Sequence, residues 1–335
     1  MPASRLPPDF ATSAAYPLYA VDAVQDRGWV LHFEAGDYAS APFLDQRGLR
    51  PGMAGWDVGR AELNESQGTA GAAAIPVHWL FHIGHCGSTL ASRLLDQVPG
   101  VLGLREPLPL LQLMHAPQPR AADWLAPTVR LLGRGFADTR AVIVKPTSVV
   151  TADATRLLAL SGGRACLLWI ALDRWLAAML RSDALVARAL DDAALAERLR
   201  PSPLPPADGA ACQLARSWLA THLHWASLAA AQPGRAIDAD FETLLAAPAD
   251  ATRRLARHFG LAAPDDLERR IETSGLMGRY AKDAAQPFDA ATRRQELDDA
   301  YARCREAIDA GVEWAARELA RGDEHGLSAR LRAPP

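Results

Sequence analysis

Short apolar runs alternate along this chain with longer stretches in which apolar residues recur every three or four positions. Residues 77–83, 141–144 and 166–172 are apolar runs of a length that suits strands buried on both faces, and residues 235–239 look like a further strand. Helical spacing follows several of these runs. The pattern predicts an α/β fold around a central parallel sheet.

Ahead of the first strand, residues 1–75 read as a small N-terminal extension. We expect residues 1–15 to be a loose tail, and residues 29–33 and 38–44 to form short strands separated by a glycine-containing turn. The Gly/Ala-rich residues 61–75 read as a linker.

The remaining residues, 76–335, form the predicted α/β domain. Its Ala/Leu-rich segment 183–232 predicts a helical insert, with helices on both sides of a proline-rich break at 201–206. Residues 290–323 predict a helical segment of mixed charge, which we expect to pack against the domain or to contact a second subunit of a homo-oligomer.

The most informative segment is Gly-His-Cys-Gly-Ser-Thr, residues 84–89, which joins the first strand to a helix. In a strand–loop–helix of this kind, the amides of the loop and of the first helical turn point at one spot, and the helix dipole adds positive charge there. Gly84 and Gly87 allow a sharp turn and a close approach to an oxyanion, while Ser88 and Thr89 offer hydroxyl groups. The segment predicts a pocket for a phosphate-like group.

This loop is not a Walker A motif, because Gly87 stands where that motif needs a lysine. It resembles instead the 5′-phosphosulfate loop of the sulfotransferases that use 3′-phosphoadenosine 5′-phosphosulfate (PAPS), which runs basic, small, Gly, Ser/Thr, Thr/Ser, apolar. The resemblance implies a three-layer P-loop-like fold, PAPS as co-substrate and no required metal. It implies that the donor is bound by His85, Cys86, Gly87, Ser88, Thr89 and Leu90. One position departs from the family, since His85 replaces the usual Lys or Arg and its charge depends on pH.

Lysine is almost absent from the chain. Of 36 basic residues only Lys145 and Lys282 are lysines, so arginine is used wherever a generic positive charge suffices. A retained lysine indicates a need for a compact ammonium rather than a planar fork. Lys145 ends the predicted strand 141–144, at the sheet edge where open α/β folds bind ligands. The resemblance places such a lysine near the sulfuryl group.

Arg174 follows the third apolar run, and Ser182 lies eight residues later. Sulfotransferases hold the 3′-phosphate of the nucleotide with an Arg and a Ser at this spacing, and the resemblance carries that role to these two residues, with Arg181 as a weaker substitute. Asp173 at the end of the same run also fits a Walker B magnesium ligand, which keeps a small-molecule kinase open as an alternative.

Glu106 precedes Pro107, a residue suited to the first turn of a helix. Some sulfotransferases carry a glutamate in such a segment that takes the proton of the acceptor, so Glu106 is the candidate general base. A helix-capping role is the alternative. Family members also bring a basic C-terminal loop over the nucleotide, which makes Arg279 and Lys282 candidate phosphate contacts.

The composition argues against several other classes of protein. A net charge of −3 argues against a general nucleic-acid binder, and no apolar stretch approaches the roughly 20 residues of a membrane span. The four cysteines show no Cys-x-x-Cys pair, so we expect no metal site and a cytoplasmic protein. The N-terminus does not show a secretory signal pattern.

The sequence therefore predicts a PAPS-dependent sulfotransferase acting on a hydroxyl or amine of a small-molecule or carbohydrate acceptor. Glu106, Lys145 and His85 are its expected catalytic residues. Two alternatives stay open at this point: a P-loop-type small-molecule kinase, and a catalytically inactive protein that binds a nucleotide or anion.

Overall fold

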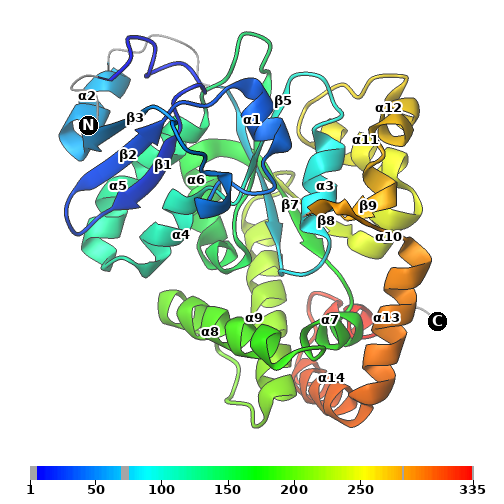
Figure 1. Cartoon of the computed structure of the whole chain (residues 1–335). Coiled ribbons are helices and arrows are strands. Elements are labelled where there is room, and N and C mark those ends of the chain that lie inside the picture. Colours follow the sequence, from blue (N-terminus) through cyan, green and yellow to red (C-terminus); the bar gives the residue numbers. More distant parts are fainter. Residues whose placement is uncertain (1–5, 69–74, 281–282, 334–335) are drawn as a thin grey trace.

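The computed structural model of the chain describes residues 6–68, 75–280 and 283–333. At its centre lies a five-stranded sheet in the order β5–β6–β4–β7–β8, whose neighbouring strands are all parallel (Figure 1). The strands are β4 (Val77–His82), β5 (Val101–Arg105), β6 (Ala141–Lys145), β7 (Gly162–Trp169) and β8 (Ala236–Asp240). This is the predicted α/β fold. β5 is not among the predicted strands, because its five residues are interrupted by Gly103 and give no continuous apolar run.

Helices cover both faces of this sheet. The chain moves in opposite directions along the sheet from β4 to β5 and from β6 to β7, so right-handed crossovers place the intervening helices on opposite faces. α3 (Ser88–Leu95) packs on β4, β5 and β6, and α6 (Ala154–Ser161) packs on β4 and β7. Covered on both sides, Trp79, Leu80 and Phe81 of β4 have no exposed surface.

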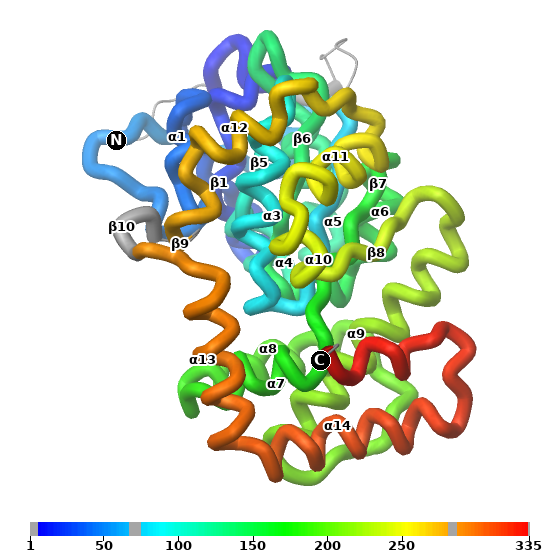
Figure 2. Tube along the Cα trace, turned by 90° about the vertical axis from the view of Figure 1, so that its right-hand side faces the viewer, coloured from blue at the N-terminus to red at the C-terminus, as the bar shows by residue number. Residues whose placement is uncertain are grey.

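Further helices complete these two layers. On the α3 side, Figure 2 shows α10 and α11 beside α3. The remaining elements around the sheet are α4 (Leu108–His115), α5 (Gln118–Leu132), α10 (Phe241–Ala246), α11 (Pro248–His258), α12 (Leu267–Ser274), the short β9 (Arg279–Tyr280) and β10 (Asp283–Pro287), and the 3-10 turns η2 (Ser148–Asp153), η3 (Leu276–Gly278) and η4 (Leu327–Arg330).

Five helices form a separate group below the sheet in Figure 1. They are α7 (Leu172–Met179), α8 (Asp183–Leu199), α9 (Ala210–Ala231), α13 (Ala290–Arg303) and α14 (Arg305–Leu319). α9 packs against α7, α8 and α14, and α13 packs against α7. The helices predicted on both sides of the break at 201–206 are confirmed. The helical segment predicted for 290–323 is confirmed as two helices that meet at Cys304.

The N-terminal region forms a three-stranded antiparallel sheet of β1 (Leu18–Asp22), β2 (Arg27–Leu31) and β3 (Gly55–Gly59). Between β2 and β3 lie α1 (Ala35–Ser40) and the 3-10 turn η1 (Gln46–Gly48), and α2 (Arg60–Gly68) follows β3. The sheet packs against the rest of the molecule through α4, which contacts β1.

Three expectations for this region are wrong. Residues 38–44 do not form a strand, because the Glu34 amide donates to the Asp37 carboxylate at 2.8 Å and this capping box starts α1. The predicted linker begins as α2, while residues 69–74 lie outside the described residues. The described part of the predicted tail is not loose, since Phe10 is buried and Ser13 forms a β-bridge with Gly135.

Candidate active site

The backbone between β4 and α3 turns sharply, as its glycines predict. Gly84, His85 and Gly87 all have positive φ, of 73°, 49° and 79°. Gly87 also lies directly against the ring of Phe241, where a Cβ atom would come within 2.1 Å of the ring carbons. Glycine is therefore required at this position twice, for its backbone conformation and for its missing side chain. α3 begins at the next residue, Ser88, and its dipole points into the loop.

Two aromatic side chains hold the loop in place. The Gly84 amide donates to Nδ1 of His82 at 3.0 Å, so Nε2 of the same ring carries the proton and donates to the Pro146 carbonyl at 2.9 Å. On the other side, the indole N–H of Trp175 donates to the Gly84 carbonyl at 3.1 Å. The loop between β4 and α3 is thereby held by the ends of β4 and β6 and by the start of α7.

Glu106 and Lys145 meet at the carboxyl ends of β5 and β6. Lys145 Nζ lies 2.5 Å from Glu106 Oε1, and the Glu106 amide donates to the Lys145 carbonyl at 2.6 Å. Lys145 is buried with 1% of its side chain exposed, whereas Glu106 keeps 17%. Glu106 has a positive φ of 52°, a conformation that residues other than glycine rarely adopt and that is often found at functional sites.

The N-terminal region adds two further side chains to this pair. The guanidinium of Arg47 lies 3.7 Å from Glu106 Oε2 and stacks on the ring of Phe43, with its Cζ 3.8 Å from the ring centroid. Lys145 Nζ lies 5.5 Å from the same centroid. The ammonium is thus held between a carboxylate and an aromatic face.

Arg105 anchors the N-terminal segment at this place. Its buried guanidinium pairs with Asp96 at 2.6 Å and donates to the carbonyls of Tyr38 and Ala41. The Leu44 amide donates to the Arg105 carbonyl at 2.7 Å. These bonds seat the segment that carries Phe43 and Arg47 against the end of β5.

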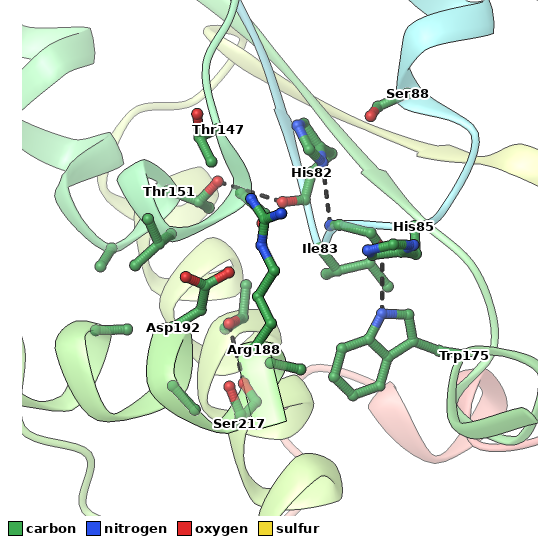
Figure 3. Close-up of a pocket in the computed structure, with 18 of the residues that line it drawn as sticks. His82, Ile83, His85, Ser88, Thr147, Thr151, Trp175, Arg188, Asp192 and Ser217 are labelled. Carbon is green, nitrogen blue, oxygen red and sulfur yellow. Dashed lines mark hydrogen bonds between the residues drawn. The ribbon is translucent and has the colours of Figure 1, made fainter. Parts of the chain in front are cut away.

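A cavity of about 180 Å³ opens between this edge of the sheet and the helices α8 and α9. His85, Ser88, Glu106 and Lys145 line its upper part. From α8, Arg188 and Asp192 project into it, and Ser217 of α9 lies at the end away from Ser88 (Figure 3). We call this space the loop–insert cavity.

A second cavity, of about 380 Å³, lies on the α3 side of the same loop. It shares His85 and Ser88 with the loop–insert cavity. Its further lining includes three arginines, three aromatic residues, two carboxylates and Thr89: Arg181, Arg279, Arg293, Phe241, Tyr280, Phe288, Asp289 and Glu296. We call it the arginine cavity. The Thr89 hydroxyl is buried there without a hydrogen-bond partner.

Arg174 is engaged with a carboxylate of α13. Its guanidinium pairs with Asp298 of α13, and within the described part of the chain Arg174 and Ser182 line neither of these two cavities. The spacing of eight residues assumes one continuous helix, but α7 ends at Met179 and Ser182 is already the N-cap of α8. Arg181, in the turn between the two helices, lines the arginine cavity instead.

Asp173 has a structural role. Its carboxylate accepts from the amides of Arg174 at 2.7 Å and Ala333 at 3.0 Å, and its own amide donates to the Leu331 carbonyl at 3.1 Å. Burial raises the pKa of this carboxyl, although those hydrogen bonds oppose the shift. Asp173 links the C-terminal segment to the start of α7 and lines neither cavity.

Cys86 is fully buried beneath the loop, with its Sγ 3.7 Å from the Leu168 carbonyl. Burial raises the pKa of its thiol to about 11, so the group is protonated near neutral pH and unsuited to nucleophilic chemistry. In the ranges that the structure describes, no group of three or more His, Cys, Asp or Glu residues is arranged to hold a metal ion. Lys282 lies outside the described residues.

No protein-family model matches this chain, and no curated protein matches it. Similar solved structures exist at low identity. STF1 of Mycobacterium tuberculosis H37Rv is 16% identical, with a TM-score of 0.37 over 67% of this chain and 77% of its own. STF9 of Mycobacterium avium is 12% identical, with a TM-score of 0.38 over 72% of this chain and 79% of its own. Mouse SULT7A1, solved in complex with PAP, is 11% identical, with a TM-score of 0.34 over 78% of this chain and 94% of its own.

All three are sulfotransferases. Among the described residues, no helix is long and apolar enough to cross a membrane.

Several residues of the site carry no sequence signal of a sulfotransferase. Phe43 and Arg47 reach Glu106 and Lys145 from a segment about 60 residues before Glu106, and only the packing of α1 and η1 brings them there. Arg188 and Arg200 of the helical insert line the loop–insert cavity without any motif. The one usable signal is general: basic residues of an insert that packs near the carboxyl edge of a parallel sheet are candidates for ligand contact.

Proposed function

We propose that this chain is a sulfotransferase that moves a sulfuryl group from PAPS to a hydroxyl or amine of a small-molecule or carbohydrate acceptor. The observation that carries the proposal is the position of the loop. His85 and Ser88 line two cavities at once, one whose wall includes three arginines and three aromatic rings, the other containing the carboxylate of Glu106 and the ammonium of Lys145. A donor nucleotide in the first cavity would present its terminal group to an acceptor in the second.

Three features of the arginine cavity suit an adenine nucleotide with phosphates at both ends. The N-terminus of α3 and the unpartnered hydroxyl of Thr89 suit the 5′-phosphosulfate. Tyr280 and Phe288 offer aromatic surface for the base. Arg181 and Arg279 offer guanidinium groups for the 3′-phosphate.

We assign the 3′-phosphate to Arg181 in preference to Arg174. Arg181 lines the cavity and its ion pair with Glu296, at 3.3 Å, is long and exposed. Arg174 faces α13 and is paired with Asp298. Arg279 remains a candidate phosphate contact, because it lines the same cavity from β9.

Glu106 is the proposed general base and Lys145 the proposed electrostatic partner. The transfer breaks the S–O bond to the 5′-phosphate and forms a bond from sulfur to the acceptor oxygen or nitrogen. The acceptor proton passes to Glu106 and the electron pair of the broken bond stays on the leaving phosphate, giving 3′-phosphoadenosine 5′-phosphate (PAP). Lys145 and His85 would stabilise the negative charge that grows on that phosphate.

The kinase alternative has less support. The loop lacks the Walker lysine, and the Asp173 carboxylate that would bind magnesium is instead bonded to backbone amides of α7 and the C-terminal segment. An inactive nucleotide-binding protein shares the same donor pocket, so only a transfer assay separates it from the enzyme.

Calorimetric titration with PAP and with Mg-ATP tests the donor class. We expect PAP to bind more tightly. Thr89→Val should weaken PAP binding about tenfold, because one hydrogen bond to an anionic ligand contributes about 1.4 kcal/mol or more. Thr128→Val is the matched control, since the Thr128 hydroxyl is also buried without a partner but lies on α5, away from the arginine cavity.

Tighter binding of Mg-ATP than of PAP would overturn the proposal in favour of a kinase. Binding of PAP without sulfuryl transfer from PAPS to a panel of carbohydrate and phenolic acceptors would favour the inactive binding protein. The transfer assay follows PAP release and the mass of the acceptor, so it detects either outcome.

A further inference from the structure

The loop–insert cavity has a second polar end, which is formed by α8 and α9 and not by the strand ends that carry Glu106 and Lys145. Arg200 follows the last turn of α8, and Ser217, Thr221 and His224 come from α9. Arg200, Ser217 and Thr221 also line an adjoining cavity of about 370 Å³ between the same two helices. These residues therefore mark the place where the two cavities meet.

Two buried nitrogen atoms at this end have no hydrogen-bond partner: Nε of Arg200 and Nε2 of His224. Both belong to side chains that line the cavity. A buried donor without a partner costs free energy, so such an atom in a side chain that lines a cavity indicates a place where a ligand can supply the acceptor. The Arg200 guanidinium donates one long hydrogen bond, from Nη2 to the Ala220 carbonyl at 3.3 Å.

The charges in the cavity wall leave Arg200 without a counter-ion among the described residues. Lys145 and Arg47 share Glu106, and Arg47 also pairs with Asp45. Burial raises the pKa of Asp192, and the charge of the nearby Arg188 opposes that shift.

The one carboxylate near Arg200 is already engaged. Glu197 binds Arg216 with both oxygens, at 2.9 and 3.1 Å, and accepts from the Ser202 amide. Burial lowers the pKa of Arg200, and the nearby Glu197 opposes that shift. Burial together with the charge of Arg200 lowers the pKa of His224 to about 4. His224 is therefore neutral near pH 7 and can donate one N–H without adding a charge.

We propose that Arg200 and His224 form an anion subsite for the acceptor, so that the substrate carries a carboxylate or a similar oxyanion at one end and its sulfated hydroxyl or amine at the other. The oxyanion accepts from Arg200 Nε and His224 Nε2, and the hydroxyls of Ser217 and Thr221 lie in the same wall. The nucleophile then faces Glu106 and the loop. This inference rests on the proposed sulfotransferase function, and it narrows the acceptor from any hydroxyl or amine to an anionic one.

Calorimetry with matched probes tests the subsite. The probes are 4-hydroxyphenylacetate and 3-(4-hydroxyphenyl)propanoate, each compared with its neutral methyl ester, and the full chain is titrated with and without saturating PAP. We expect at least one carboxylate to bind about tenfold or more tightly than its ester, because a charge-assisted hydrogen bond to a buried donor is lost in the ester. Arg200→Gln should bring the ratio of the two dissociation constants, ester over carboxylate, close to one.

Arg198→Gln is the control, since Arg198 is an exposed residue of the same helix that lines neither cavity. His224→Gln gives a second route if Arg200→Gln does not fold, and should reduce the ratio severalfold. Equal affinities for acid and ester, no binding of either carboxylate, or a preference that survives both substitutions would overturn the subsite.

The separate titration with PAP keeps the two proposals apart. If PAP does not bind but the carboxylate preference depends on Arg200, the sulfotransferase proposal fails and the anion subsite stands. If PAP binds with the expected dependence on Thr89 and no carboxylate preference exists, the subsite alone fails.

Discussion

Lys145 and Glu106 are joined twice, once through their side chains at 2.5 Å and once through the Glu106 amide and the Lys145 carbonyl at 2.6 Å. The parallel register of β5 and β6, which sets Arg105 opposite Lys145, brings the two residues together. The backbone bond accompanies the positive φ of Glu106, so the carboxylate is held in one place by both strand ends. A carboxylate fixed in this way beside an ammonium is suited to receive a proton without moving.

Glu106→Gln should lower kcat about 100-fold or more while the Kd for PAP stays within about twofold. The amide keeps the size of the side chain and can accept a hydrogen bond from Lys145, but it does not take a proton. Steady-state kinetics and calorimetry give the two quantities. Glu62→Gln, an exposed change on α2, is the control. Retention of most of kcat would reduce Glu106 to a structural partner of Lys145.

Arg181→Gln should weaken PAP binding about tenfold, whereas Arg174→Gln should leave it within about twofold. Arg181 lines the arginine cavity, and a guanidinium–phosphate contact is charge-assisted. Arg174 instead loses only its partly exposed pair with Asp298. Titrations at two salt concentrations should show a smaller salt dependence for the Arg181 variant. A larger loss with Arg174→Gln would restore the assignment that its spacing from Ser182 suggests.

Much of this arrangement could be predicted from local sequence. The loop at 84–89 follows from a strand, two glycines and a helix in direct succession, and Lys145 follows from its place at the end of an apolar run. Such features depend on residues close in the chain. The sequence also predicts the general α/β fold, since alternating strands and helices bury their apolar faces in few ways.

The rest depends on contacts between distant segments. The Arg174 assignment requires a helix that continues to Ser182, and the end of α7 at Met179 has no glycine or proline to announce it. The position of Arg47 beside Glu106 depends on the buried Arg105, which holds α1 and the residues after it. Arg200 and His224 line one cavity only because α9 folds back on α8 after the proline-rich break.

Gly87→Ala should destabilise the protein by more than the ordinary cost of a positive φ and should remove PAP binding. A side chain at φ 79° costs about 1–2 kcal/mol, and the new Cβ would also meet the ring of Phe241 at 2.1 Å. The loop must then shift away from the first turn of α3. Urea unfolding and PAP titration measure both effects.

Gly162→Ala distinguishes the cost of a positive φ from the cost of the clash with Phe241. Gly162 also has a positive φ, of 64°, but a Cβ there would meet no atom within 4 Å. This variant should lose only about 1–2 kcal/mol and should bind PAP normally. Equal losses of stability in the two variants would mean that Phe241 yields to the added methyl group.

The fully buried His222 makes the stability of the protein sensitive to mild acid. Its Nδ1 donates to the Trp218 carbonyl at 2.8 Å, its ring stacks on Trp218, and burial lowers its pKa to about 3. In the unfolded chain the same imidazole titrates near 6.5. Below that pH the unfolded state binds a proton that the folded state does not, so the stability present above pH 6.5 falls as the pH drops towards 3.

For one such histidine, the free energy of unfolding is about 2 kcal/mol lower at pH 5 than at pH 7. His222→Gln should lower stability at pH 7, because the stacked ring is lost, but it should reduce the further loss between pH 7 and pH 5 by about that amount. Urea unfolding at the two pH values measures it. His115→Gln, at an exposed position, should leave the pH dependence as it is in the parent protein. If His222→Gln keeps the full acid sensitivity, the loss of stability must come from other groups. His78 and His224 are the first to examine, because burial lowers the pKa of each to about 4.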